Sequence, residues 1–182
     1  MRKSILTLTC ALVLLSCSIQ GLTNDYSKLN QTEKTKIVAL ENFEKVDPEH
    51  VYKINANQLK QELSKHPKSL VYIFKNGCTS DLCKPMFVYE NFANKNGYKL
   101  FLVMNGYANL NETLEQRINF KSPLFSIDNE YYKSKYRNTY MRYFENDLQG
   151  KPIDAAEGKY LGNLFFFKGN QLEKIERELP KS

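Results

Sequence analysis

Residues 70–83 join an apolar run to a pair of cysteines: Leu70-Val71-Tyr72-Ile73-Phe74, then Lys75-Asn76-Gly77, then Cys78-Thr79-Ser80-Asp81-Leu82-Cys83. The continuous apolar run predicts a strand that is buried on both faces. Apolar residues at helical spacing follow, so we expect a helix beyond the cysteines. A strand that leads into two close cysteines and a helix suits dithiol chemistry, because a helix N-terminus stabilises a thiolate. The stretch therefore points to a redox function.

The first twenty residues predict export and lipid attachment. Arg2 and Lys3 precede an apolar run, residues 5–15, that is too short to span a bilayer and has the length of a signal-peptide core. Residues 14–17, Leu-Leu-Ser-Cys, resemble the lipobox of bacterial lipoproteins, in which the chain is cut before a diacylated cysteine. We therefore expect residues 1–16 to be a lipoprotein signal peptide. Its cleavage would remove Cys10 from the mature chain, and Cys17 would carry the lipid.

The remaining chain predicts a tether and one domain. Residues 17–45 are rich in Asn, Gln, Ser, Thr and Lys, with one apolar group at 37–40, and are typical of a polar tether. Residues 46–182 then form a single domain of ordinary size. The net charge of +6 falls to +4 without Arg2 and Lys3, an excess too small to indicate a nucleic acid partner.

Strand and helix signals alternate through residues 46–182. The expected strands are an edge strand at 51–54, central strands at 70–74 and 100–104, a short strand at 123–128, and a hairpin of 164–167 with 172–175. The expected helices carry four apolar stripes: Leu59 and Leu63; Leu82, Met86, Tyr89 and Phe92; Leu110, Leu114 and Ile118; and Tyr136, Tyr140, Tyr143 or Phe144, and Leu148. This order predicts an α/β fold with a central mixed sheet, flanking helices and a C-terminal antiparallel hairpin.

The order of these elements, with Pro123-Leu124-Phe125-Ser126-Ile127-Asp128 before the last helix and a Phe-rich hairpin turning at Lys168-Gly169-Asn170, resembles a thioredoxin-like domain of the redoxin type. The resemblance covers about residues 50–179. It implies a membrane-anchored, extracytoplasmic thiol–disulfide oxidoreductase of the bacterial cell envelope, facing the periplasm or the exterior. The implied partners are exported protein thiols or a membrane redox partner, and the chain is expected to be a monomer without a cofactor.

The resemblance also implies a role for each cysteine. Cys78, at the end of the strand, would be the attacking thiol, and Cys83 would be the resolving thiol. A disulfide needs Cα atoms within about 7 Å, so Cys78 must lie outside the helix and fold back. We expect Ser80 or Asp81 to cap the helix, which would place Cys83 in its first turn and Pro85 near its start.

Several positions depart from the family pattern. Four residues separate the cysteines where thioredoxins have two, and the chain contains no tryptophan. Gly162 and Asn163 stand where the substrate-holding cis-proline of the family would fall, so they are the expected substrate-facing residues. Residues 70–74 contain no carboxylate to shuttle a proton, and residues 71–77 lack the threonine and proline that precede a peroxidatic cysteine. The sequence therefore excludes a peroxidase.

Two alternatives remain open. A cysteine pair beside Pro85 is also similar to copper-delivery proteins of this fold, and thiolates suit Cu(I). Those proteins add a late histidine, whereas here His50 and His66 precede the cysteines and the later candidate ligands are thioethers, Met86, Met104 and Met141. The second alternative is a non-catalytic binding or scaffolding lipoprotein, in which the disulfide only closes a loop and contributes about 2 kcal/mol.

Overall fold

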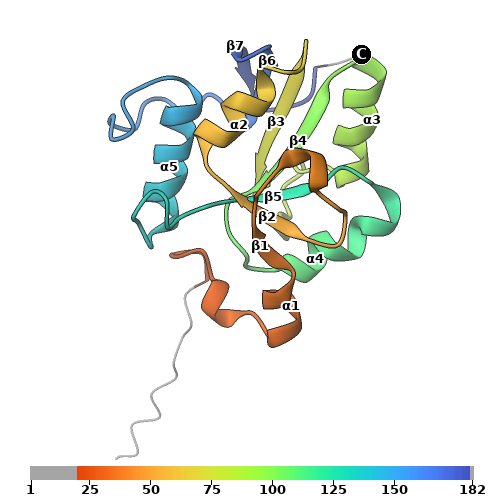
Figure 1. Ribbon diagram of the computed structural model, residues 1–182, viewed down its shortest axis with the longest axis vertical. Coiled ribbons are helices and arrows are strands. Elements are labelled where there is room, and N and C mark those ends of the chain that lie inside the picture. The colour runs from red at the N-terminus through yellow and green to blue at the C-terminus, as the bar shows by residue number, and fades with distance from the viewer. Residues whose placement is uncertain (1–19, 181–182) are drawn as a thin grey trace, which may run out of the picture.

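The computed structural model describes residues 20–180, which form a seven-stranded mixed sheet flanked by helices (Figure 1). The strands are β1 Ile37–Ala39, β2 Val51–Ile54, β3 Ser69–Phe74, β4 Lys99–Met104, β5 Leu124–Ile127, β6 Leu164–Lys168 and β7 Gln171–Glu176. The helices are α1 Gln31–Thr35, α2 Ala56–Leu63, α3 Met86–Asn96, α4 Leu110–Glu115 and α5 Arg137–Leu148, with 3-10 turns at Tyr26–Lys28, Phe43–Lys45 and Gln116–Asn119. The α/β class with flanking helices and a C-terminal hairpin is thus confirmed. The signal peptide and Cys17 lie outside the described residues.

Strand β3 lies near the middle of the sheet, whose order is β1-β2-β5-β4-β3-β6-β7. It pairs in parallel with β4 along its whole length, from Ser69 opposite Lys99 to Phe74 opposite Met104. On its other edge it pairs antiparallel with β6. All six residues of β3 are buried, as expected for a strand covered on both faces.

Helices cover both faces of the sheet. One face packs against α3 and α4 through side chains such as Tyr72, Tyr89 and Leu110, and the other packs against α2 and α5 through side chains such as Leu59 and Phe144. The chain steps from β2 across to β3 and then back through β4 to β5. Because crossovers between parallel strands are right-handed, steps in opposite directions place their helices on opposite faces.

The expected tether is wrong for the described residues up to 45. Strand β1 pairs in parallel with β2, from Ile37 opposite Val51 to Ala39 opposite Lys53. Leu40 is buried, and the ring of Phe43 packs against Phe101 and Phe125. The short apolar group that interrupts the polar segment is therefore a strand. It covers β2, the expected edge strand, which instead lies between β1 and β5.

Two helices differ in extent from the expected stripes. Helix α4 ends at Glu115 and continues as a 3-10 turn, so Ile118 projects into solvent with 83% of its surface exposed. Helix α5 begins at Arg137, which leaves Tyr136 before its first turn and exposed, while Tyr140, Phe144 and Leu148 face the core as expected. A change from 3.6 to 3.0 residues per turn rotates a stripe away from the face it started on.

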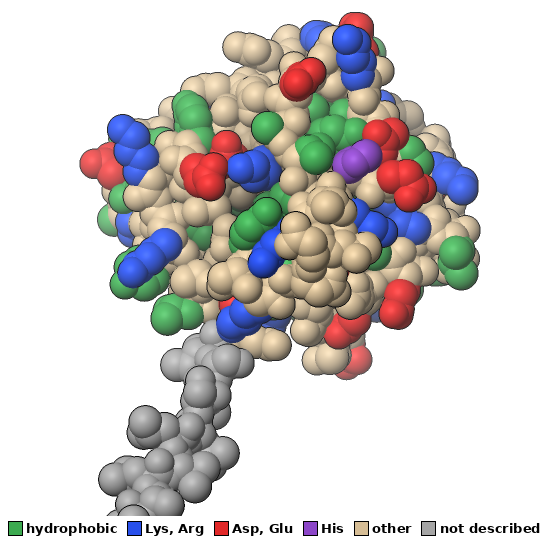
Figure 2. Space-filling model, turned by 60° about the horizontal axis from the view of Figure 1, so that its bottom comes forward, with side chains coloured by type: hydrophobic (Ala, Val, Ile, Leu, Met, Phe, Trp, Pro, Cys, Tyr) green, Lys and Arg blue, Asp and Glu red, His purple; other side chains and the backbone are tan. Residues whose placement is uncertain are grey.

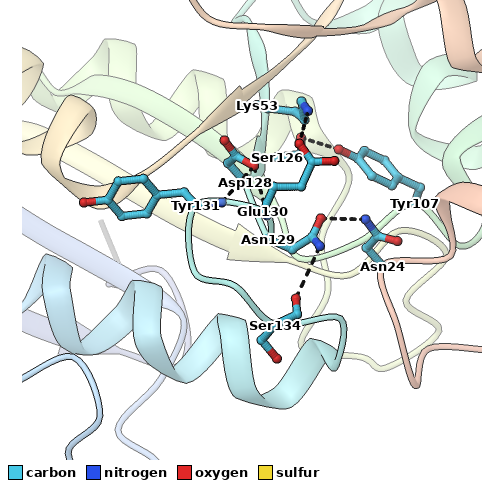
Figure 3. A network of polar contacts seen from close by, with 9 residues as sticks. All are labelled: Asn24, Lys53, Tyr107, Ser126, Asp128, Asn129, Glu130, Tyr131 and Ser134. Atoms are coloured by element: carbon cyan, nitrogen blue, oxygen red, sulfur yellow. Dashed lines mark hydrogen bonds and ion pairs between the residues drawn. The ribbon is translucent and has the colours of Figure 1, made fainter.

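The N-terminal segment, residues 20–45, crosses the carboxyl ends of β4 and β5 at Asn24 (Figure 3). Asn24 donates a side-chain hydrogen bond to Asn129 Oδ1 at 2.7 Å, and its carbonyl oxygen accepts one from the Tyr107 amide at 2.8 Å. The Tyr107 hydroxyl lies 2.8 Å from Ser126 Oγ on β5. One side-chain and one backbone hydrogen bond at the strand ends thus attach this segment to the domain.

Leu40→Ala tests whether this N-terminal segment is part of the domain. We expect the substitution to lower the free energy of unfolding by about 2 to 4 kcal/mol, because it leaves a cavity under β1. Leu22→Ala, in the same segment but 54% exposed, is the matched control and should change it by less than about 0.5 kcal/mol. Urea unfolding of both variants measures the difference, and equal, small effects would restore the tether interpretation.

Candidate functional site

The cysteine loop begins on a buried polar anchor at the end of β3. Asn76 is 1% exposed, and its side-chain oxygen accepts a hydrogen bond from Thr113 Oγ1 at 2.6 Å. Its amide nitrogen donates to the Gly106 carbonyl at 2.8 Å. These bonds join the carboxyl ends of β3 and β4 to α4. They fix the point from which the loop leaves the sheet.

Gly77 makes the turn out of the sheet. Its φ of +63° lies in the left-handed region, and a Cβ at this position would stand 2.5 Å from Asn109 Nδ2. Only glycine meets both the backbone conformation and the close approach without strain. The sequence Asn76-Gly77 therefore aims the following residue away from the strand.

Cys78 and Cys83 form a disulfide, with their Cα atoms 6.1 Å apart. The loop between them contains a turn in which the Cys83 amide donates to the Ser80 carbonyl at 2.9 Å. Cys78 is exposed and Cys83 is half-buried. The expected pairing is present, and the cysteine assigned to attack is the more accessible of the two.

The expected start of the following helix is wrong. Helix α3 begins at Met86 with Pro85 as its N-cap residue, so Cys83 lies before the helix and not in its first turn. A proline disfavours helical backbone at the residue before it, here Lys84, which separates the Ser80 turn from α3. Leu82 consequently points outward and is 49% exposed instead of lining the helix stripe.

Two stacked tyrosines support the loop from below. The rings of Tyr72 on β3 and Tyr89 on α3 are 4.0 Å apart between centroids. The Tyr89 hydroxyl accepts a hydrogen bond from the Lys84 amide at 3.2 Å, directly after Cys83. Burial raises the pKa of Tyr72, so its hydroxyl stays neutral. The stack holds the segment between the disulfide and α3.

The disulfide separates two cavities of about 380 and 350 Å³. Four residues line both cavities: Cys78, Cys83, Tyr72 and Lys75. The first cavity extends toward α4 and is also lined by Met86, Phe87, Glu112, Thr113 and Gln116. The second extends toward α5 and is also lined by Asn105, Met141, Glu145, Tyr160, Asn163 and Arg177. A reactant can therefore approach the disulfide from either side of the loop.

The two expected substrate-facing residues separate. Asn163 lines the second cavity together with the cysteines, whereas Gly162 lines a different cavity between α5 and the hairpin. The backbone of Asn163 is fully engaged, because its carbonyl accepts from the Ile73 amide at 2.9 Å and its amide donates to the Glu176 carbonyl at 3.2 Å. The described residues contain no cis peptide bond, including at this position.

Glu145 is a site residue that the sequence interpretation missed. It lies on α5 one turn after Met141, and both side chains line the second cavity. Burial, reinforced by the neighbouring Glu157 carboxylate, raises the pKa of Glu145 from 4.5 to about 7, while Lys151 acts in the opposite direction. The sequence places residues 141 and 145 on one helix face. It contains no signal that this face meets the cysteine loop.

The positions of the histidines and methionines test the copper-delivery alternative. His50 lies within 2.9 Å of Asp47 and His66 within 3.0 Å of Glu62, so each is engaged with a local carboxylate. Among residues 20–180, no three His, Cys, Asp or Glu side chains gather into a metal-binding group. Of the thioethers, Met86 lines the first cavity and Met141 the second, on opposite sides of the disulfide.

The distribution of charge on the surface bears on whether the protein binds a nucleic acid. On the face drawn in Figure 2, Lys and Arg side chains lie among Asp and Glu side chains and do not merge into one basic area. Nucleic-acid surfaces instead gather their positive charge into a patch or stripe. No helix within residues 20–180 has both the length and the apolar composition to cross a bilayer.

Comparison of the chain with protein-family models, curated proteins and solved structures found no match. The chemistry open to the site therefore rests on its own geometry.

Asn76→Ala tests the anchor of the loop. Removing the side chain leaves Thr113 Oγ1 and the Gly106 carbonyl without their buried partner, so we expect the free energy of unfolding to fall by about 2 to 3 kcal/mol. Ser80→Ala, in the exposed loop itself, should change it by less than about 0.5 kcal/mol. Chemical denaturation of the oxidised variants measures both, and a neutral Asn76→Ala would contradict the anchoring role.

Glu145→Gln tests the raised pKa through stability. A carboxyl whose pKa is higher in the folded state favours folding below its unfolded pKa of 4.5, and that advantage is lost as pH rises through about 7. The variant should therefore gain stability relative to the wild type between about pH 5 and 8, by about 1 to 2 kcal/mol after allowance for solvent screening. Unfolding at both pH values measures this, with Glu112→Gln as the exposed control that should show no such gain.

Proposed function

We propose that this chain is a thioredoxin-like thiol–disulfide oxidoreductase that acts through Cys78 and Cys83. The observation that carries the proposal is the disulfide at the carboxyl end of the central strand, with an exposed first cysteine and a cavity on each side. Open α/β sheets form their sites at the carboxyl ends of their strands. A disulfide that served only as a staple has no need of this position.

The topology supports the thioredoxin-like interpretation. Strand β3 leads into the cysteines, α3 returns the chain to β4 in parallel, and the hairpin of β6 and β7 continues the sheet on the other side of β3. Strand β5 and helix α5 are added between β4 and the hairpin, and β5 lies between β4 and β2. The addition supplies the wall of the second cavity.

The exchange reaction follows from the accessibility of the two cysteines. In the reduced protein, the Cys78 thiolate attacks one sulfur of a substrate disulfide, forms a mixed disulfide and releases the first substrate thiolate. Cys83 then loses its proton and its sulfur attacks Cys78 Sγ, which closes the protein disulfide and releases the second substrate thiolate. The protein dithiol loses two electrons and the substrate disulfide gains them, and the reverse sequence oxidises a substrate dithiol.

The proposed setting is the bacterial cell envelope, with lipidated Cys17 as the anchor and the domain facing the periplasm or the exterior. The partners in this setting are thiols of exported proteins or a membrane redox protein, and the chain acts as a monomer without a cofactor. In an oxidising compartment of this kind the cysteine pair is expected to be closed as the Cys78–Cys83 disulfide. Electrons for each reductive turnover must then come from the membrane redox partner.

A second candidate is a non-catalytic binding lipoprotein on the same fold. One observation favours it: both backbone groups of Asn163 are hydrogen-bonded within the sheet, so this position offers no free backbone to a bound substrate chain. In that case the disulfide contributes stability only, and the cavities beside it hold a partner. The two candidates differ in the redox behaviour of the cysteine pair.

The reduction potential of the Cys78–Cys83 pair separates these candidates. We expect a value between about −120 and −270 mV, the range of working thiol oxidoreductases. Equilibration of the full-length protein in glutathione buffers, followed by thiol trapping and mass spectrometry, measures it. A potential below about −300 mV would identify a structural disulfide and favour the binding protein.

Single-cysteine variants test the assigned roles. Cys83→Ser should accumulate mixed disulfides with partner proteins through Cys78, because no resolving thiol remains to release them. Cys78→Ser should accumulate far fewer, since Cys83 is half-buried. Non-reducing gels of each variant expressed at the same level make the comparison, and equal trapping by both variants would reject the assignment.

A further inference from the structure

A single carboxylate and the two cysteines line the second cavity together. Its lining includes both cysteines and side chains from β3, α5 and the segment before β6, and Glu145 is the one acidic residue among them. Its volume of about 350 Å³ is large enough for several water molecules. A proton can therefore pass between the carboxylate and a cysteine through water without a direct contact between them.

Glu145 is available for such a transfer because it has no other assignment. Its carboxylate makes no hydrogen bond or ion pair with any described residue, and it is half-buried on α5. By contrast Asp147, on the same helix, is paired with Lys60 Nζ at 2.7 Å. A partly buried carboxylate without a hydrogen-bond partner is unfavourable for folding, and a carboxylate of this kind in a cavity is a candidate for a functional role.

The charges around Glu145 keep it titratable near neutral pH. Burial and the exposed Glu157 carboxylate raise its pKa to about 7, and Lys151 partly offsets them. The other titratable and charged groups that line the cavities touching Glu145 are Lys75, Arg142, Lys159, Tyr160 and Arg177. Arg177 is engaged by the carbonyl and ring of Tyr160, so it is not a partner of Glu145.

We propose that Glu145 accepts the proton of the Cys83 thiol, through water in the second cavity, when Cys83 attacks the mixed disulfide on Cys78. The Cys83 S–H bond breaks as the Cys83–Cys78 S–S bond forms, and the bond from Cys78 to the substrate sulfur breaks. The electron pair of that bond leaves with the substrate thiolate, which then takes the proton from Glu145. This inference rests on the proposed oxidoreductase function and supplies a carboxylate, which residues 70–74 lack.

The first cavity holds a rival carboxylate, Glu112 on α4. Glu112 is exposed, so bulk water can take its place in any proton transfer. Glu145 is half-buried and lies on the side of the loop away from α4. Substitution of each residue by glutamine removes the charge with little change in shape, so the two variants form a matched pair.

The test is the closure of a mixed disulfide followed over pH. The full-length chain carries Cys10→Ser and Cys17→Ser in all variants, so that only the two loop thiols react. The reduced protein in detergent is mixed with one equivalent of the aromatic disulfide DTNB, which releases one coloured thiolate when Cys78 reacts and a second when Cys83 closes the disulfide. The rate of the second release, between about pH 5 and 9, reports the step assigned to Glu145.

We expect the wild-type closing rate to rise with an inflection near pH 7. Glu145→Gln should lose this inflection and close about a hundredfold more slowly at pH 7, the lower end of the usual range for general acid–base catalysis, while its first release is unchanged. Glu157→Gln should keep the inflection and move it to lower pH, because the charge that raises the pKa of Glu145 is gone. Glu112→Gln should behave as the wild type.

Three results would overturn the inference. Closing rates of Glu145→Gln that match the wild type at every pH would remove Glu145 from the reaction, while leaving the oxidoreductase proposal intact. Loss of the inflection in Glu112→Gln instead would assign the proton to the first cavity. A wild-type protein that releases the first thiolate but never closes would reject the proposed function itself, and this inference with it.

Discussion

Burial of β3 on both faces sets the arrangement of the other elements. Each of its six residues is buried, and each of its edges is paired, with β4 on one side and β6 on the other. Strand β3 ends at Phe74, at the carboxyl edge of the sheet. Two residues later, the hydrogen-bonded side chain of Asn76 anchors the chain. The cysteine loop therefore emerges at a place that the core determines.

The cysteine loop is anchored at both ends and accessible between them. Asn76 and Gly77 define where the loop leaves the sheet, and the stacked rings of Tyr72 and Tyr89 hold its far end through the Lys84 amide. Between these supports the disulfide is flanked by cavities on both sides. The proposed thiol exchange requires a sulfur that an incoming sulfur can reach, and a loop anchored in the core keeps that geometry constant.

Strand β5 and helix α5, which lie between β4 and the hairpin in the chain, contribute to the surroundings of the cysteine loop. Strand β5 extends the sheet, and α5 packs beside α2, where Lys60 pairs with Asp147 at 2.7 Å. Helix α5 in this position brings Met141 and Glu145 toward the cysteines. A carboxylate absent from β3 is thus present across the cavity, on an element far away in the sequence.

Hydrophobic periodicity predicts β3, β4, the hairpin and most of α5, because a long apolar pattern can bury its apolar side chains in only one type of secondary structure. The same pattern predicts the place of the cysteine pair after a central strand. It does not predict the start of α3, because Pro85 and the turn at Ser80 outweigh a plausible apolar stripe. Nor does it predict β1, since three residues within a polar segment become a strand only when β2 offers them an edge.

The α/β class, the buried central strand and the two cysteines that follow it can all be derived from the amino-acid sequence, because they depend on local pattern and on neighbours in the chain. Three other features follow from tertiary contacts alone: residues 37–39 complete the sheet, Asn163 and not Gly162 faces the cysteine cavity, and Glu145 shares that cavity. These features depend on contacts between segments up to about one hundred residues apart, and such contacts leave no period in the sequence.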